Sequence, residues 1–412
     1  MELSISLPGL SLFLLLLLSA MAAPPMVAGI GINYGQIANN LPSPEQVVPL
    51  VKSIGATKVK LYDADPKVLC AFAKTGIEFT VGLGNEYLAQ MRNLDRARAW
   101  VKNKVQAFLP DTKITCIAVG NEVLTSNNTV LVESIVPVME NVHTSLVELG
   151  LDKQVTVTTA HSIAVLETSY PPSTGRFRRD LTGCMTKVLD FQCRTGSPFL
   201  INAYPYFAYQ ASPKQVTLDF VLFQSSQGIL DTSTNLHYEN MLFAQIDAMY
   251  SALSAIGYKN LTVHVSETGW PSKGDANEVG ATPENAKKYN GNLMKIVSQK
   301  KGTPMRPDHE FNLYVFALFN ENLKPGPTSE RYYGLFNPDG TPVYSLGIPA
   351  KDGNSNSNTT SSGGSGGGSA IWPPPPNGYL SITSSSGRTE PAGASVVLGL
   401  ALLKLFFLYR IY

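Results

Sequence analysis

Hydrophobic and polar positions along the chain predict eight β-strands separated by helical segments. Each predicted strand is a short run that is either apolar throughout or alternates between apolar and polar residues, which is typical of strands in a covered sheet. The strands fall at residues 30–34, 58–62, 78–83, 114–119, 155–159, 199–204, 261–265 and 312–319.

Segments with helical periodicity lie between these strands, and residues 44–54, 66–74 and 283–299 are three of them. Each of these three begins with a proline, which the first turn of a helix tolerates, after a Ser, Asp or Thr that can cap it. Further helical segments are predicted at 94–108, 130–149 and 238–256. Strands that alternate with helices eight times predict an α/β chain folded as a (β/α)8 TIM barrel.

A doubly wound parallel sheet is the structural alternative to a barrel. That fold commonly carries a G-x-G-x-x-G turn after its first strand, whereas the chain here reads GIGINYG. We therefore favour the barrel. Residues 208–237 are too long for a plain connection and predict a small insertion after strand six.

The first 28 residues resemble a secretory signal peptide. An apolar run at 7–18 precedes the small residues Ser19, Ala20, Ala22 and Ala23, although no basic residue comes before the run. Cleavage after Ala22 and cleavage near Ala28 remain open. A signal anchor is the alternative, and the apolar run is short for a membrane span.

The character of the chain changes again after the last predicted strand. We assign residues 29–349 to the catalytic domain and residues 350–385, rich in Ser, Gly and Pro, to a linker. Residues 386–412 combine a polar spacer with an apolar tail, the layout of a glycosylphosphatidylinositol (GPI) attachment signal that is removed, with Ser385 as the attachment site. A C-terminal anchoring helix is the alternative, and Lys404 and Arg410 count against it.

Composition narrows the range of partners. The chain has 412 residues, 15% of them charged, and a formal net charge of +1. This balance gives no reason to expect nucleic acid as a partner, and we expect a monomer. Three N-x-S/T sequons predict N-glycosylation in a secreted protein. They begin at Asn127, Asn260 and Asn358.

The four cysteines show no spacing typical of a metal site. Cys184 and Cys193 are near enough in sequence to close a small disulfide loop in a secreted protein. Cys70 lies in a helical pattern and Cys116 in an apolar strand, so we expect both to be buried free thiols.

Candidate chemistry lies at the carboxyl ends of the predicted strands, where barrel enzymes place their active sites. The seventh strand leads into LTVHVSETGWPSK, which sets Glu267 at its end. The fourth strand ends in Asn121 and Glu122, so the two glutamates would face each other across the mouth of the barrel. Glycoside hydrolysis requires such a pair, one as acid and one as nucleophile or base.

Several motifs in this framework resemble glycoside hydrolase family 17, the plant endo-β-1,3-glucanases. They are GINYGQIANNLP, VKLYDADP, AVGNEVL, INAYPYFAY, VSETGWPSKG and FALFNENLKPGPTSERYYGLF. The resemblance implies a barrel that cleaves β-1,3-glucan internally with retention of configuration, and neither a metal nor a cofactor. It also implies that Glu122 is the proton donor, that Glu267 is the nucleophile, and that Glu321 and Lys324 line the site.

Physical reasoning adds expectations for individual residues. Asn121 would hold the sugar 2-hydroxyl. Glu122 must stay protonated, which requires a raised pKa, and Glu267 must be ionised, which Lys324 or Tyr204 would favour. Glu321 is either a partner of Lys324 or a supporting catalytic group.

Aromatic residues at strand ends are candidate platforms for glucose rings. We predict Tyr34, Tyr204 and Trp270 as the platforms. A wider set consists of Tyr206, Phe207, Tyr332, Tyr333 and Phe336, and we expect about half of all these aromatics to belong to the core.

The sequence thus predicts a secreted, GPI-anchored endo-β-1,3-glucanase acting on callose-like glucan at the outer face of the plasma membrane. Many relatives in this family carry a C-terminal cysteine-rich carbohydrate-binding module, and no cysteine follows Cys193 here. Two alternatives remain: a 1,3-1,4-β-glucanase of the same family, and a catalytically silent cell-surface protein that binds glucan.

Overall fold

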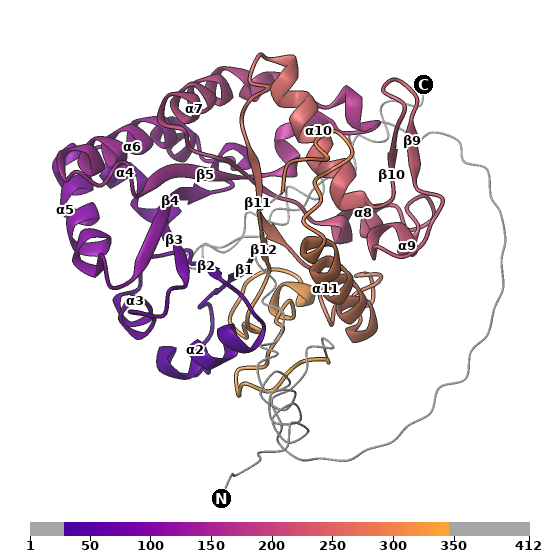
Figure 1. The fold of residues 1–412 in the computed structure, drawn as a ribbon, viewed down its shortest axis with the longest axis horizontal. Helices are drawn as coiled ribbons and strands as arrows, with labels where there is room; N and C mark the ends of the chain where they lie inside the picture. The colour runs from indigo at the N-terminus through magenta and orange to yellow at the C-terminus, as the bar shows by residue number, and fades with distance from the viewer. Residues whose placement is uncertain (1–28, 311, 346–412) are drawn as a thin grey trace, which may run out of the picture.

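Eight parallel strands close into a barrel with helices outside it, as the sequence predicts (Figure 1). The computed structural model describes residues 29–310 and 312–345. Around the barrel the strands follow the order β1, β12, β11, β8, β5, β4, β3 and β2, and every neighbouring pair is parallel. Their bounds are β1 Ile30–Asn33, β2 Lys58–Lys60, β3 Glu78–Leu83, β4 Lys113–Asn121, β5 Thr156–Ser162, β8 Phe199–Asn202, β11 Val263–Thr268 and β12 Leu313–Val315.

The seventh barrel strand, β11, runs further than its apolar pattern suggests. The sequence predicts its end at Val265, but it continues to Thr268 and so contains Glu267. A bulge lies between Val265 and Glu267 in the pairing with β8. Ser266 and Glu267 both contact polar groups at the carboxyl end of the barrel. Strict alternation would send these consecutive side chains to opposite faces, and the bulge removes that constraint.

The helices that cover the barrel confirm most of the predicted segments and add two, Leu88–Met91 and Thr182–Thr195. Asp65 and Thr282 accept hydrogen bonds from backbone amides of the first turns of α3 and α11, as capping residues do. The helix Thr182–Thr195 was not predicted. It begins after a 3-10 turn without a side-chain cap, so it lacks the usual start signal. The bounds are α2 Pro44–Ser53, α3 Pro66–Ala71, α4 Leu88–Met91, α5 Leu94–Lys104, α6 Thr129–Glu148, α7 Thr182–Thr195, α10 Met241–Ala255 and α11 Pro283–Ser298.

Two insertions interrupt the alternation of strands and helices. The predicted insertion after the sixth barrel strand contains α8 (Pro205–Ala211), α9 (Leu218–Val221) and a hairpin of β9 (Ile229–Asp231) and β10 (Leu236–Tyr238). This hairpin lies at the edge of the molecule beside α8 and α9 (Figure 1). A second hairpin, unpredicted, follows β5 and pairs β6 (Leu166–Thr168) with β7 (Arg176–Phe177).

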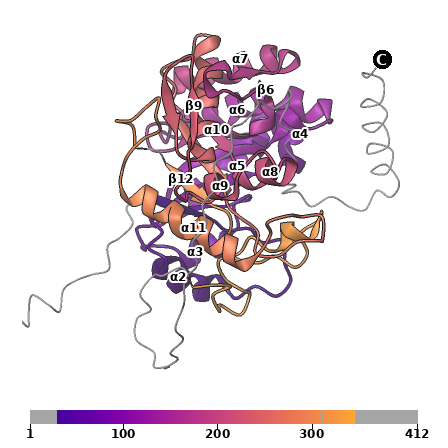
Figure 2. The same cartoon turned by 90° about the vertical axis from the view of Figure 1, so that its right-hand side faces the viewer.

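One helix within the described ranges, α6, is long and apolar enough to cross a membrane by length and composition. Its residues Ile135, Val138, Met139 and Val142 are buried, and the helix packs against α5 and α7. Figure 2 shows it among the other outer helices. The apolar face of α6 is therefore covered by the barrel domain itself.

The cysteines differ from the prediction in two respects. All four are free thiols, so the predicted disulfide between Cys184 and Cys193 is wrong. Both lie on α7, and nine residues of helix separate them by about 13.5 Å along the axis, far beyond the reach of a disulfide. Cys70 is exposed rather than buried, whereas Cys116 is buried as expected.

Several predictions concern residues outside the described ranges. These are the signal peptide at 1–28, the whole linker at 350–385 with Asn358, the attachment site Ser385 and the tail at 386–412. They stay predictions. The sequons at Asn127 and Asn260 lie within the described part, and both asparagines are exposed.

Candidate active site

The two predicted catalytic glutamates lie at the carboxyl ends of their strands, as the barrel architecture predicts. Glu122 directly follows β4, and Glu267 is the second-last residue of β11. Both are almost fully buried, at 7% and 1% exposure. The side chain of Asn202, at the end of β8, connects the two strands because it contacts both Glu122 and Ser266.

Glu122 occupies a setting that keeps its carboxyl protonated. Its backbone is left-handed, with φ of 53°, an uncommon conformation for a residue with a side chain. One carboxyl oxygen, Oε1, accepts a hydrogen bond of 2.9 Å from Asn202 Nδ2, and Oε2 is buried without a partner. Burial, together with the negative charge of Glu267, raises the pKa of Glu122 to about 8. The predicted proton donor therefore carries its proton at neutral pH.

Glu267 has the opposite electrostatic setting. Its Oε1 lies 2.9 Å from the ammonium of Lys60, and its Oε2 accepts a hydrogen bond of 2.8 Å from the Tyr204 hydroxyl. Burial alone would raise the pKa of Glu267, but the Lys60 charge and hydrogen bond outweigh it and hold the pKa below its ordinary value. The predicted nucleophile is therefore ionised.

A chain of amides fixes the orientation of the acid. Ser266 Oγ donates to Asn202 Oδ1 at 2.7 Å, which leaves the Asn202 amide nitrogen to donate to Glu122. The same nitrogen lies 3.3 Å from Asn121 Oδ1. Asn121 is itself held by Asn85, whose side chain bonds both its backbone amide and its carbonyl. Asn121 directly precedes Glu122 in the chain, and its contact with a sugar 2-hydroxyl stays a prediction.

Glu321 and Lys324 are both buried in the site, but they do not pair with each other through their side chains. Glu321 Oε1 accepts a 2.7 Å hydrogen bond from the backbone amide of Ile37, which ties the loop after β1 to this segment. A Cβ at Gly35 would meet the Glu321 carboxylate at 2.5 Å, so a larger residue there would displace that carboxylate. Lys324 Nζ lies 3.3 Å from Glu330 instead and 4.0 Å from the centre of the Phe316 ring.

The structure overturns the predicted role of Trp270. The indole is fully buried, its nitrogen donates to the carbonyl of Gly280 at 2.8 Å, and its ring packs against Tyr206 and Tyr289. No face of the ring is open to a sugar, so Trp270 is a core residue. The position at a strand end suggested otherwise, because the sequence does not show the loop that covers it.

Tyr34 and Tyr204 are also too buried to act as stacking platforms, at 2% and 6% exposure. Tyr34 packs edge-on against Phe319, whereas Tyr204 uses its hydroxyl to position Glu267. In the wider aromatic set, Tyr206, Tyr333 and Phe336 are core residues. Phe207 and Tyr332 are half-exposed, and Phe207 packs against Tyr204, so these two rings are the better candidates for contact with a sugar.

Three residues of the site were not identified from the sequence: Lys60, Asn202 and Glu330. Lys60 had only a weak signal, because β2 reads Lys-Val-Lys and the sequence does not show which of the two lysines is fully buried and requires a partner of opposite charge. Asn202 lies two residues before Tyr204, the predicted end of its strand, so it was not among the candidates at strand ends. Glu330 falls in a 3-10 turn, Thr328–Arg331, far from any strand end.

The arrangement can perform acid-assisted displacement at a carbon that carries a leaving oxygen. A neutral carboxyl at the end of β4 and an ionised carboxylate on β11, each with its own hydrogen-bond partners, supply a proton donor and a nucleophile at the same pH.

Comparison with known proteins agrees with this geometry. Residues 30–348 match the family model of glycosyl hydrolases family 17. Glucan endo-1,3-beta-glucosidase 10 of Arabidopsis thaliana is 62% identical over 349 residues, which are 84% of this chain and 82% of that protein. Glucan endo-1,3-beta-glucosidase 11 of the same plant is 59% identical over 344 residues, 83% of this chain and 81% of that protein.

Two solved structures are similar over the barrel. CJP38, a β-1,3-glucanase and allergen of Cryptomeria japonica pollen, has a TM-score of 0.75 and 41% identity, covering 78% of this chain and all of that one. A chain from a study of two plant β-glucan endohydrolases with distinct substrate specificities has a TM-score of 0.71 and 36% identity, covering 76% of this chain and 99% of its own length.

Proposed function

The chain belongs to glycosyl hydrolases family 17, and we propose that it is a glucan endo-1,3-β-glucosidase that cleaves by a retaining, two-glutamate mechanism. The observation that carries the mechanism is the opposite protonation of two buried carboxyls. Glu122 has a pKa raised to about 8, whereas that of Glu267 is lowered. A pair set in this way supplies both an acid and a nucleophile near neutral pH.

In the first step, Glu267 attacks the anomeric carbon and the glycosidic C–O bond breaks. Glu122 gives its proton to the departing oxygen, which leaves a covalent glucosyl–enzyme ester on Glu267. In the second step, Glu122, now ionised, takes a proton from water. The resulting hydroxide attacks the same carbon, and Glu267 leaves as a carboxylate. Two inversions give net retention.

The Glu267→Gln variant tests the nucleophile. It keeps the size of the side chain but removes the attacking charge, so turnover on linear β-1,3-glucan should collapse while glucan binding persists. The Glu267→Gly variant should recover partial turnover with added azide and yield the inverted glycosyl azide, because the small anion attacks from the vacated face. Turnover of Glu267→Gln above a few per cent of wild type at saturating substrate would show that another group is the nucleophile.

The Glu122→Ala variant tests the acid. It should lose far more activity on glucan, whose sugar leaving group needs a proton, than on aryl glucosides, whose leaving group needs little protonation. Equal losses on both substrates would contradict the assignment. Thermal denaturation of the variant separates such a result from misfolding.

The shape of the glucan-binding groove, rather than the catalytic pair, determines which glucans are cleaved. We propose callose-like β-1,3-glucan as the substrate, with Phe207 and Tyr332 as stacking contacts. Mixed-linkage 1,3-1,4-β-glucan is the second candidate, since one similar structure comes from a pair of endohydrolases with distinct specificities. Reducing-sugar release from linear β-1,3-glucan and from mixed-linkage glucan separates the two. Release from neither would indicate a glucan-binding protein without activity.

We also propose that the protein is secreted and held at the outer face of the plasma membrane by a GPI anchor on Ser385. The support is sequence order: small residues, a polar spacer and an apolar tail that contains Lys404. Phosphatidylinositol-specific phospholipase C should release the protein from membranes. Detection of residues 396–412 in the mature protein by peptide mapping would contradict the anchor.

A further inference from the structure

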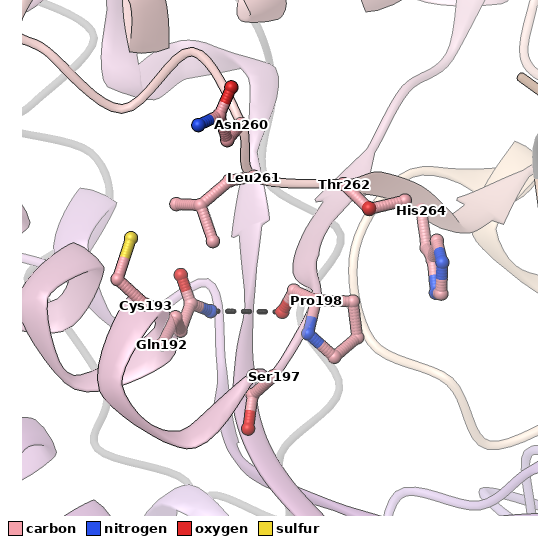
Figure 3. A pocket seen from close by; sticks show the side chains of 9 residues that line it. Gln192, Cys193, Ser197, Pro198, Asn260, Leu261, Thr262 and His264 are labelled. Atoms are coloured by element: carbon pink, nitrogen blue, oxygen red, sulfur yellow. Dashed lines mark hydrogen bonds between the residues drawn. The ribbon is translucent and has the colours of Figure 1, made fainter.

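A pocket of about 340 Å³ opens at the end of the barrel opposite the catalytic pair (Figure 3). It lies where α7 ends and where β8 and β11 begin. Ser197 and Pro198 directly precede β8, and residues 260–262 directly precede β11. The catalytic residues lie at the other ends of these strands, so the pocket is separate from the active site.

The pocket is lined by a complete N-glycosylation sequon. Asn260, Leu261 and Thr262 are consecutive lining residues and read Asn-Leu-Thr. Asn260 and Thr262 are exposed, while Leu261 is buried. Figure 3 shows the side chains of Asn260, Leu261 and Cys193 on the same side of the pocket. A sugar attached to Asn260 would therefore begin at the pocket itself.

The lining offers both apolar surface and hydrogen-bond acceptors. Leu261 and Pro198 supply the apolar part. Gln192 is fully buried, and its Oε1 has no hydrogen-bond partner among the described residues. N-acetylglucosamine matches this surface with an apolar C–H face, an acetamido methyl, an amide N–H and hydroxyl donors.

We propose that this pocket is the docking site for the first N-acetylglucosamine of a glycan on Asn260. The proposal rests on the proposed secretion, because only the secretory pathway attaches such a glycan. A tether of one residue holds the sugar at an effective concentration in the millimolar range or above, so a weak site suffices. The docked sugar covers Cys193, whose thiol is exposed in the bare chain.

Cys193 therefore reports on docking, and Cys70, the other exposed thiol, is an internal control. The experiment compares maleimide labelling of the glycoprotein, of the same protein trimmed by endoglycosidase H to one N-acetylglucosamine, and of the Asn260→Gln variant. Peptide mass spectrometry reads each thiol separately. Asn127→Gln, which removes the other described sequon, is the matched control. Glucan hydrolysis is measured on every form.

We expect Cys193 to label about tenfold more slowly in both glycosylated forms than in Asn260→Gln, which corresponds to a sugar docked about nine-tenths of the time. Cys70 labelling and glucan hydrolysis should be the same in all forms. A single-sugar form that labels as fast as Asn260→Gln would overturn docking, and so would an unoccupied Asn260 in a protein glycosylated at Asn127. Either result leaves the glucanase assignment untouched, since hydrolysis is measured separately.

Discussion

Lys60 favours the ionised form of Glu267, the proposed nucleophile, and the Lys60→Met variant tests this directly. The ammonium lies 2.9 Å from Glu267 Oε1, and both side chains are buried. A hydrogen bond to a charged group contributes about 1.5–3 kcal/mol. Removing the cation disfavours ionised Glu267 by that amount, so the pKa of Glu267 rises. At acidic pH the ionised fraction, and hence kcat, should fall roughly 10- to 150-fold, since each 1.36 kcal/mol is tenfold.

The assay is the pH dependence of kcat on linear β-1,3-glucan. The acid limb reports Glu267 and should move to higher pH in Lys60→Met, which narrows the active range from the acid side. Lys58→Met is the matched control. Lys58 lies in the same strand but bonds Asn312 Oδ1 at 2.6 Å, not Glu267. A folded Lys60→Met enzyme with the wild-type acid limb and rate would refute the reasoning.

Further predictions concern the pair and its surroundings. Tyr204→Phe removes the 2.8 Å hydrogen bond to Glu267 and should lower kcat by about tenfold with little change in KM, as steady-state kinetics would reveal. Wild-type activity should decline as pH rises through about 8, where Glu122 loses its proton. Because the folded state holds that proton and the unfolded state releases it above about 4.5, the Tm of wild type should fall relative to Glu122→Gln between pH 5 and 8. Trp270→Phe should reduce the free energy of unfolding by about 1–3 kcal/mol without raising KM. Phe207→Ala should raise KM with little change in the free energy of unfolding. A raised KM in Trp270→Phe would indicate that the indole contacts the glucan after all.

The sequence predicted the barrel well because each covered strand carries its own apolar pattern. It placed Glu122 and Glu267 correctly for a related reason: the carboxyl ends of parallel strands meet at one end of the barrel. The exact end of β11 could not be predicted, since the bulge that extends the strand depends on its pairing with β8. α7 was missed because it lacks a capping residue.

The polar contacts of the site were less predictable than its position. Tyr204 and Lys324 were expected to support ionised Glu267, and the Tyr204 hydrogen bond and the Lys324 charge both do so, but the direct ion-pair partner is Lys60. Pairing between distant segments decides such contacts, and Lys60 and Glu267 are separated by 207 positions in the chain. Trp270 illustrates the same limit for aromatics. Its exposure depends on a loop folded over it, which no local pattern records.

The left-handed backbone of Glu122 has an evolutionary consequence. A residue with a side chain at φ of 53° stores about 1–3 kcal/mol of strain, and burying a carboxyl with one unpartnered oxygen adds to it. Glycine would adopt the same backbone without strain and bury no carboxyl. Replacement of Glu122, the proposed proton donor, by glycine is therefore expected to make the fold more stable, not less. A gene copy released from selection for hydrolysis would accumulate substitutions of Glu122 that stabilise the fold and would become an inactive glucan-binding protein. Selection for turnover opposes this change.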